Sequence, residues 1–131
     1  MLTANYVVFG TAWTQSLPLV DNLKRMALLT EMLVNHGYQF ELVAGRYKGV
    51  DEQSLAIAVH TQEIAKQIAR HVGAIFQQEC VGLLEVSTLE FSLLYPTRTM
   101  ETLGKLLPVP EPDAMAAPNG ATFWQGQWWV A

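Results

Sequence analysis

Two apolar runs joined by a short polar segment constrain the fold of this chain more than any other feature. Residues 40–44 and 54–59 are both strand-like, and the segment 45–52 between them is too short for the crossover that parallel neighbours need. The sequence therefore predicts an antiparallel pair. The polar segment carries Tyr47 and Glu52, which rigid strands on both sides would hold in place.

The other segments extend this pair to a larger fold. Apolar residues at three- and four-residue steps, with caps and stops, predict helices at 20–35, at 61–73 between Thr61 and Gly73, and a short one at 99–106. Runs rich in β-branched and aromatic residues predict strands at 6–13, 38–44, 54–60, 80–86, 89–95 and 122–130. Prolines between 108 and 118 predict an extended loop.

Strand, helix, strand, strand, helix, strand is the order of a ferredoxin-like βαββαβ sandwich. We therefore expect an α+β protein of this kind with extra strands at its C-terminal end. Two helices would cover one face of the sheet, and the open face would be solvated or buried by association. The apolar composition favours association, and fold-level analogy suggests a PII-like trimer with ligand sites between subunits.

Length and composition narrow the class of protein. The 131 residues have room for a single domain, 1–131, and 50% of them are hydrophobic, which favours a homo-oligomer. A net charge of −4 with eight Lys and Arg argues against nucleic acid as a partner. No apolar run approaches the ~20 residues of a membrane span, and the N-terminus does not resemble a secretory signal. We therefore expect no membrane partner. One cysteine permits no internal disulfide, so we expect a cytoplasmic protein.

Common catalytic and metal-binding motifs are missing from the sequence. His36, His60 and His71 lack the spacing of metal ligands, and Cys80 has the neighbours of an inert, buried strand residue. There is no phosphate-binding glycine loop, dinucleotide fingerprint or nucleophile elbow. We therefore expect no metal site and no cofactor.

Five side chains are candidates for a site, and each has a plainer alternative. Trp13 follows the first strand and would wall a pocket or be an ordinary core aromatic. Asn22 and Arg25, in the first turn of the first helix, would hold a carboxylate or be solvated. Tyr47 and Glu52 would act chemically or belong to a solvated hairpin. The late tryptophans are expected to pack rather than to stack on a ligand: Trp124, Trp128 and Trp129.

Several short motifs occur in order along nearly the whole chain. They are the first strand with its aromatic end, Asn22-x-x-Arg25, Gly45-x-Tyr47, Asp51-Glu52, Gln78-Glu79-Cys80-Val81 and Trp129. Together they resemble the phage-encoded S-adenosylmethionine lyases, a family formerly called S-adenosylmethionine hydrolases. One feature departs from the family pattern, because the segment between Tyr47 and Glu52 is several residues shorter here.

The resemblance implies an enzyme that cleaves S-adenosylmethionine to 5′-methylthioadenosine and L-homoserine lactone, with the substrate's own carboxylate displacing the sulfonium sulfur. It also implies a homotrimer with active sites between subunits and catalytic roles for Tyr47 and Glu52. Trp13, Asn22 and Arg25 are then the expected substrate-binding residues. The implied biological use is depletion of the host's methyl donor, which would blunt methylation-dependent restriction.

Charge changes during such a reaction limit what Glu52 can do. Carboxylate and sulfonium neutralise each other as the bond forms, so a low-dielectric pocket favours the transition state. A carboxylate against the sulfonium would stabilise the starting state, so Glu52 is better used on the substrate α-ammonium. Tyr47 would hydrogen-bond the same end of the ligand or wall the methylthio group. Two alternatives stay open: a true hydrolase with Glu52 as general base, and a non-catalytic trimeric regulator that binds an adenine-containing ligand.

Overall fold

The computed structural model describes residues 4–47, 49–118 and 120–131. The helices in this part of the chain are α1 (Leu19–Asn35), α2 (Gln62–Phe76) and α3 (Glu111–Ala116). The strands are β1 (Tyr6–Gly10), β2 (Gln39–Tyr47), β3 (Val50–Val59), β4 (Val81–Glu85), β5 (Glu90–Leu94), β6 (Met100–Lys105), β7 (Leu107–Val109), β8 (Ala121–Trp124) and β9 (Gln127–Val130).

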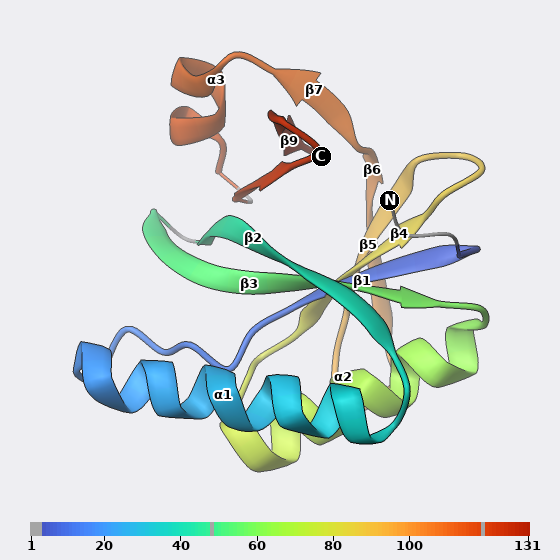
Figure 1. Ribbon diagram of the computed structural model, residues 1–131. Helices are drawn as coiled ribbons and strands as arrows, with labels where there is room; N and C mark the ends of the chain where they lie inside the picture. The colour runs from blue at the N-terminus through green and yellow to red at the C-terminus, as the bar shows by residue number, and fades with distance from the viewer. Residues whose placement is uncertain (1–3, 48, 119) are drawn as a thin grey trace.

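The described strands form one nine-stranded sheet in the order β6-β5-β4-β1-β3-β2-β8-β9-β7. Every pair of neighbours in it runs antiparallel. The predicted pairing of the two apolar runs is confirmed, since β2 pairs with β3 from Gln39↔Ala58 to Tyr47↔Val50. Helices α1 and α2 lie side by side against one face of the sheet (Figure 1).

Local sequence explains why the two long helices form where they do. Thr61 caps α2, because its hydroxyl accepts a hydrogen bond from the backbone N–H of Ile64 at 3.2 Å. Residues at three- and four-residue steps face the sheet in both helices: Met26, Leu29 and Leu33 in α1, and Ala65, Ile68, Ala69, Val72 and Phe76 in α2. With β1, β3 and β4 they form the larger hydrophobic core.

The two edge strands of the sheet are neighbours in the sequence. Strands β6 and β7 lie at opposite ends of the strand order, yet only Leu106 separates them. The sheet therefore curls round until its two ends are close, as Figure 1 shows. Leu106 is buried in a second core, together with Val7, Phe9, Val43, Ala56, Leu84 and Trp124. The sheet face that the helices leave open is thus partly covered by the chain's own C-terminal strands, which sequence analysis did not predict.

The predicted stop of α2 at Gly73 is wrong. The helix continues to Phe76 and ends at Gln77, which has a left-handed backbone conformation with φ of 55°. Gly73 provides space instead, because a Cβ atom there would lie 2.4 Å from Cγ of Pro96. This glycine lets α2 pack closely against the turn that follows β5.

Three predictions for the C-terminal part of the chain are also wrong. Residues 99–106 are not a helix but contain β6, which pairs with β5. The predicted loop 108–118 contains α3, whose N-cap and first turn accommodate prolines because no backbone N–H is needed there. The predicted strand 122–130 is the hairpin β8–β9, with positive φ at Gln125 and Gly126 in its turn.

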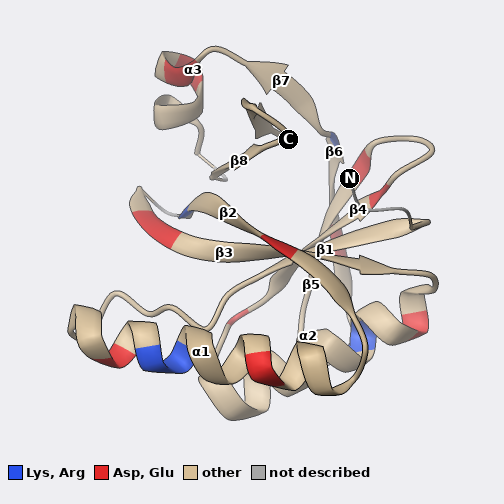
Figure 2. Cartoon of the chain, viewed as in Figure 1, with Lys and Arg blue, Asp and Glu red and all other residues tan. Residues whose placement is uncertain are grey.

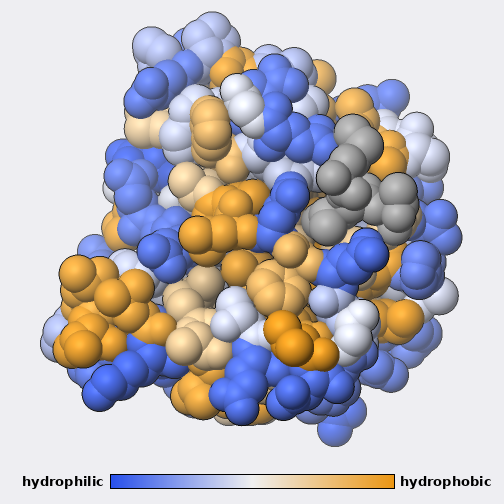
Figure 3. Space-filling model, viewed as in Figure 1, coloured by the Kyte–Doolittle hydropathy of each residue, from blue (hydrophilic) through white to orange (hydrophobic). Residues whose placement is uncertain are grey.

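Charged and apolar groups are both prominent on the surface. Acidic residues lie on all three helices and on β2 and β3, and basic residues lie beside them on α1 and α2 (Figure 2). Apolar patches lie over the N-terminal end of α1 and over β2 (Figure 3). The exposed apolar side chains at the N-terminal end of α1 are Leu19, Val20 and Leu23, and those on β2 and the neighbouring β8 are Leu42 and Phe123. Among the helices described, none combines the length and the apolar character that a membrane span requires.

Candidate active site

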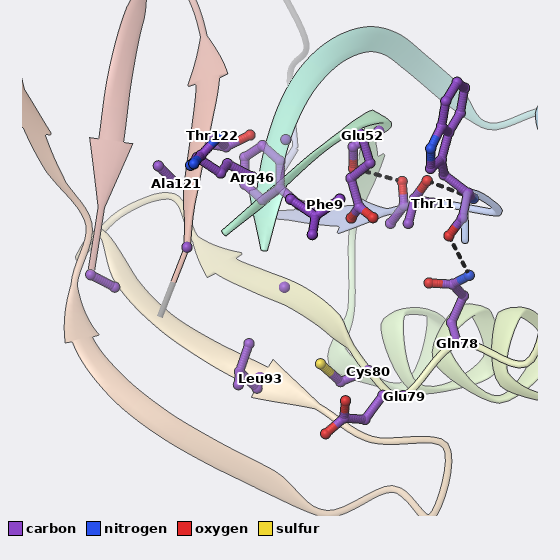
Figure 4. Close-up of a pocket in the computed structure, with 18 of the residues that line it drawn as sticks. Phe9, Thr11, Arg46, Glu52, Gln78, Glu79, Cys80, Leu93, Ala121 and Thr122 are labelled. Carbon is purple, nitrogen blue, oxygen red and sulfur yellow. Dashed lines mark hydrogen bonds between the residues drawn. The ribbon is translucent and has the colours of Figure 1, made fainter. Parts of the chain in front are cut away.

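A cavity of about 370 Å³ lies within the curl of the sheet. Its volume falls in the range of roughly 300–1,000 Å³ that small-molecule sites have. The end of β1, the β2–β3 pair, the segment before β4 and the C-terminal strands all contribute to its wall (Figure 4). The side chains discussed below that line it are Phe9, Thr11, Trp13, Arg46, Glu52, Ser54, Gln78, Glu79, Cys80, Thr122 and Trp129.

Glu52 is the group in this cavity whose ionisation is most altered. Desolvation by burial raises the pKa of its carboxyl group from 4.5 to about 7. Within the described part of the chain, its carboxylate makes no hydrogen bond and no ion pair. The cavity therefore contains an acidic group near its titration midpoint at neutral pH, which a bound cation would stabilise in its charged form.

The backbone around Glu52 is not the polar loop that the sequence suggested. Strands β2 and β3 continue to pair through this region, with Gly45 opposite Glu52 and Tyr47 opposite Val50. Glu52 is consequently held by regular strand backbone on both sides. Tyr47 is the last residue of β2, and its side chain lies outside the described part of the structure.

Arg46 brings a cation to the wall of the same cavity, which sequence analysis missed. Its guanidinium forms an ion pair with Asp51, with 2.6 Å between Nη1 and Oδ1. The two residues are directly opposite each other in the β2–β3 ladder. The Nε of Arg46 is buried and has no hydrogen-bond partner among the described residues. Arg46 is thus paired with Asp51, and burial is the cause of the raised pKa of the Glu52 carboxyl.

Trp13 lines the cavity, as one of its two sequence interpretations required. It lies in the loop after β1, which ends at Gly10 rather than at Trp13 as predicted. The side-chain amide of Gln78 donates a hydrogen bond to the backbone carbonyl of Trp13 at 3.0 Å (Figure 4). This contact ties the loop to the segment that precedes β4.

Asn22 does not line the cavity but holds the loop that does. Its side chain is 2% exposed, so the alternative that it is solvated is wrong. The amide oxygen accepts from Thr14 N–H at 2.9 Å, while the amide nitrogen donates to the carbonyl oxygens of Thr14 and Leu17 at 2.9 and 3.3 Å. These bonds engage both polar atoms of the buried side chain in holding the loop.

Arg25 has a similar place on the next turn of α1. Its Nε donates to the carbonyl oxygen of Ala12 at 2.7 Å, and Nη2 donates to that of Phe76. Its guanidinium also lies over the Phe76 ring, 5.4 Å from the centroid. Arg25 therefore connects the loop after β1 to the C-terminal end of α2, where a cation is favourable. It does not line the cavity.

Other cavity residues were absent from the sequence-based set of site residues. Gln78 and Glu79 line it, and the motif Gln78-Glu79-Cys80-Val81 is the feature of the sequence that could have indicated them. Cys80 lies just before β4 and is partly exposed at the cavity, so its prediction as a buried strand residue is wrong. Trp129 also lines the cavity, and its indole N–H donates to the Trp124 carbonyl at 2.8 Å.

The prediction that the C-terminal tryptophans pack is confirmed for Trp124. It is 8% exposed, and its ring meets that of Phe9 edge to face, with 5.3 Å between centroids. Its indole N–H also donates to the Glu41 carboxylate at 2.8 Å. No group of three or more His, Cys, Asp or Glu that would suit a metal ion occurs among the described residues.

The fold and the cavity thus define a small mixed helix-and-sheet protein with a ligand-sized site suited to a cationic ligand. The sequence model of the S-Adenosylmethionine lyase family matches residues 8–131, and the chain belongs to this family. The match covers every residue that lines the cavity. A comparison with curated proteins gives no match.

Proposed function

We propose that this protein cleaves S-adenosylmethionine to 5′-methylthioadenosine and L-homoserine lactone in the cavity described above. In this reaction an oxygen of the substrate carboxylate forms a bond to the γ-carbon, the bond from that carbon to the sulfonium sulfur breaks, and the sulfur keeps the electron pair. No water is consumed and no proton has to move. Family membership supports the substrate and the lyase class.

The observation that carries this proposal is the buried carboxylate of Glu52, which has no hydrogen bond or ion pair among the residues that the structure describes. Desolvation raises its pKa to about 7, so an ionised Glu52 in the empty cavity is unfavourable. S-adenosylmethionine carries an α-ammonium and a sulfonium, either of which would compensate this charge. We assign Glu52 to the ammonium, because stabilising the sulfonium would lower the energy of the starting state more than that of the transition state.

Positioning and low polarity would supply the rate. Aromatic and aliphatic side chains form much of the wall, among them Phe9, Trp13 and Trp129. A water-poor site of this kind favours a step in which carboxylate and sulfonium neutralise each other. Holding the methionine arm curled makes the attack intramolecular, for which effective molarities on the order of 10⁵–10⁸ M are known.

Tyr47 and the assembly of the enzyme complete the proposal. We place Tyr47 beside the methionine arm as a second catalytic residue. Its position at the end of β2, next to the cavity-lining Arg46, supports this role.

Residues 1–131 would form one ferredoxin-like lyase domain, as supported by the order β4-β1-β3-β2 with α1 and α2 on one face. We also propose that the protein assembles into a trimer and is cytoplasmic. The exposed apolar side chains of Leu19, Val20 and Leu23 on α1 and of Leu42 on β2 support the assembly. Light scattering should then give three times the chain mass of 14.6 kDa.

A true hydrolase is the second candidate. A carboxyl group with a pKa of about 7 is well matched to general base catalysis near neutral pH. In that case Glu52 would take a proton from water as the water oxygen attacks the γ-carbon. The bond from that carbon to the sulfonium sulfur would break with its electron pair going to sulfur, and the products would be homoserine and 5′-methylthioadenosine.

Incubation with S-adenosylmethionine, followed by chromatography, tests the proposal. The wild-type protein should release 5′-methylthioadenosine, and a folded Glu52→Gln variant should lose most of this activity. Binding without any product would favour a non-catalytic regulator instead. Wild-type rates in the Glu52→Gln variant would remove Glu52 from its role. If the enzyme is active, expression in a phage-infected host should lower methylation of DNA, as an anti-restriction role requires.

A further inference from the structure

Thr11 makes two hydrogen bonds that connect two segments of the cavity wall, the loop after β1 and strand β3. It is the first residue after β1, it is 7% exposed, and it lines the cavity. Its hydroxyl oxygen accepts from the backbone N–H of Trp13 at 3.0 Å, and its O–H donates to the carbonyl oxygen of Gln53 at 2.5 Å (Figure 4). Gln53 directly follows Glu52 in β3, so a single oxygen atom joins the backbone of the aromatic wall to the backbone that carries the carboxylate.

These bonds occur where the regular strand pairing stops. The last residue pair between β1 and β3 is Gly10↔Leu55, and the chain then leaves the sheet. Just beyond this pair, the hydroxyl of Ser54 donates to the Gly10 carbonyl at 2.8 Å. Two side-chain hydroxyls thus take over from the backbone ladder and hold the loop after β1 against β3.

The side chain of Thr11 is well suited to this task. Its β-branched carbon restricts χ1, so the hydroxyl is held in one direction. The sulfur of Met26, 3.5 Å from the same hydroxyl, is a weaker acceptor than the Gln53 carbonyl. A valine at this position would keep the shape of the side chain and remove both bonds, whereas a serine would keep the hydroxyl.

We propose that Thr11 is a positioning residue that sets the separation between Trp13 and Glu52 in the cavity wall. This inference rests on the proposed function for its kinetic consequences, but not for the geometry itself. Trp13 lies in the loop after β1 and Glu52 lies in β3, and the bonds of Thr11 directly link the backbone of this loop to that of β3. Through them, the wall that contacts the ligand keeps a fixed distance from the carboxylate that orients the ligand's charged arm.

Three variants test this role: Thr11→Val, Thr11→Ser and, as a matched control, Thr97→Val. Thr97 lies in the turn between β5 and β6, and among the described residues its hydroxyl pairs only with that of Thr99. With S-adenosylmethionine as the probe, Thr11→Val should lower kcat by about tenfold or more, because a misplacement of about 1 Å can cost on the order of 10²-fold. Thr11→Ser should retain at least about half of the wild-type kcat by the same geometric reasoning. A wild-type kcat in Thr11→Val, or equal losses in the valine and serine variants, would overturn the proposal.

A measurement on the ligand-free protein separates this inference from the proposed function. NMR titration of ¹³C-labelled glutamate follows the ionisation of Glu52 directly. In Thr11→Val the midpoint should move from about 7 towards the ordinary carboxyl range, because the strand is free to carry Glu52 towards solvent. Thr11→Ser and Thr97→Val should leave it unchanged. If Thr11→Val does not fold, Ser54→Ala should move the midpoint in the same direction, and an unchanged midpoint there would equally overturn the proposal.

Discussion

Gly45 lies directly opposite Glu52 in the β2–β3 ladder, so the carboxylate has no side chain facing it from the neighbouring strand. A Cβ atom at Gly45 would lie 3.6 Å from Cγ of Glu52 and 3.4 Å from Cβ of Ser54. A methyl group at position 45 would thus make only ordinary van der Waals contacts, so the fold itself does not require a glycine there. The glycine keeps open the space that a ligand needs beside the acidic group.

Gly45→Ala should therefore fold normally and bind substrate less well. The added methyl group would occupy cavity space next to Glu52, and we expect kcat/KM for S-adenosylmethionine to fall about fivefold, equivalent to about 1 kcal/mol. Ala44→Ser, at the neighbouring exposed position of β2, serves as the control. Equal kinetics of Gly45→Ala and wild type would show that the ligand does not approach this part of β3.

The rate should depend on pH through the ionisation of Glu52. The pKa of about 7 in the free protein implies that only a minority of molecules carry the charged form at pH 6 and most carry it at pH 8. Because kcat/KM reports groups of the free enzyme, it should rise about tenfold between these pH values. A bound ammonium lowers the pKa, so kcat itself should change less over this range.

A profile of kcat/KM that is flat from pH 6 to pH 8 would contradict this assignment. Glu79 and Arg46 line the same cavity, so the profile should be repeated in Glu52→Gln. The residual activity of that variant should lose the rise near pH 7 if Glu52 causes it.

Replacing Glu52 should also stabilise the protein above neutral pH. Its pKa is higher in the folded chain than the ordinary 4.5, so the unfolded chain ionises first as the pH rises. The resulting destabilisation begins above pH 4.5 and is complete above about pH 7. Glu52→Gln should therefore raise the free energy of unfolding at pH 8 by about 1–3 kcal/mol, after allowance for partial solvent screening, and have little effect at pH 4.

Urea unfolding at fixed protein concentration measures this difference. Glu90→Gln, at an exposed position of β5, provides the comparison. A Glu52→Gln variant that is less stable than wild type at pH 8 would mean that the carboxylate has a stabilising partner.

The loop that carries Trp13 should depend on Asn22. In Asn22→Leu the partly buried N–H and C=O of Thr14 lose their partners, which should lower the free energy of unfolding by about 1–3 kcal/mol. KM should rise as well, since the loop lines the cavity. The exposed Lys24→Gln should change neither quantity, and a stable Asn22→Leu with a raised KM would instead indicate direct substrate contact.

Gly73→Ala tests the close packing of α2 against the turn after β5. The new methyl group would overlap with Pro96, and overpacking of this kind typically costs about 1–3 kcal/mol. We expect a lower Tm than for wild type, whereas Ala74→Ser at the next, exposed position should have a small effect. A higher Tm in Gly73→Ala would show that helix propensity outweighs the contact with Pro96.

Local patterns were sufficient to predict the first two thirds of the fold. The spacing of Met26, Leu29 and Leu33 identified α1, Thr61 marked the start of α2, and the short connection between β2 and β3 required an antiparallel pair. The C-terminal third gave no such signal. Strand β6 is mostly exposed and lacks apolar alternation, so its own residues give no strand signal, although the turn 95–99 joins it directly to β5.

Site residues were predictable where chemistry and position coincide in the sequence, and not where the fold brings them together. Glu52 and Trp13 reach one cavity because β1 and β3 are neighbours in the sheet. Arg46 and Thr122 reach it through the β2–β8 pairing, which the sequence does not indicate. Asn22 was misread because a polar side chain in a first helical turn is normally solvated, and only the fold shows that the loop after β1 buries it.

The origin of the oxygen atoms in the product tests the central claim most directly. The reaction is run in H₂¹⁸O and followed by early-time NMR and mass spectrometry, with an enzyme-free sample as background. Attack by the substrate's own carboxylate predicts unlabelled homoserine lactone first, and then homoserine labelled only in its carboxyl group as the lactone hydrolyses. Homoserine that appears without a lactone precursor and carries ¹⁸O in its hydroxyl group would contradict the lyase mechanism and establish direct hydrolysis.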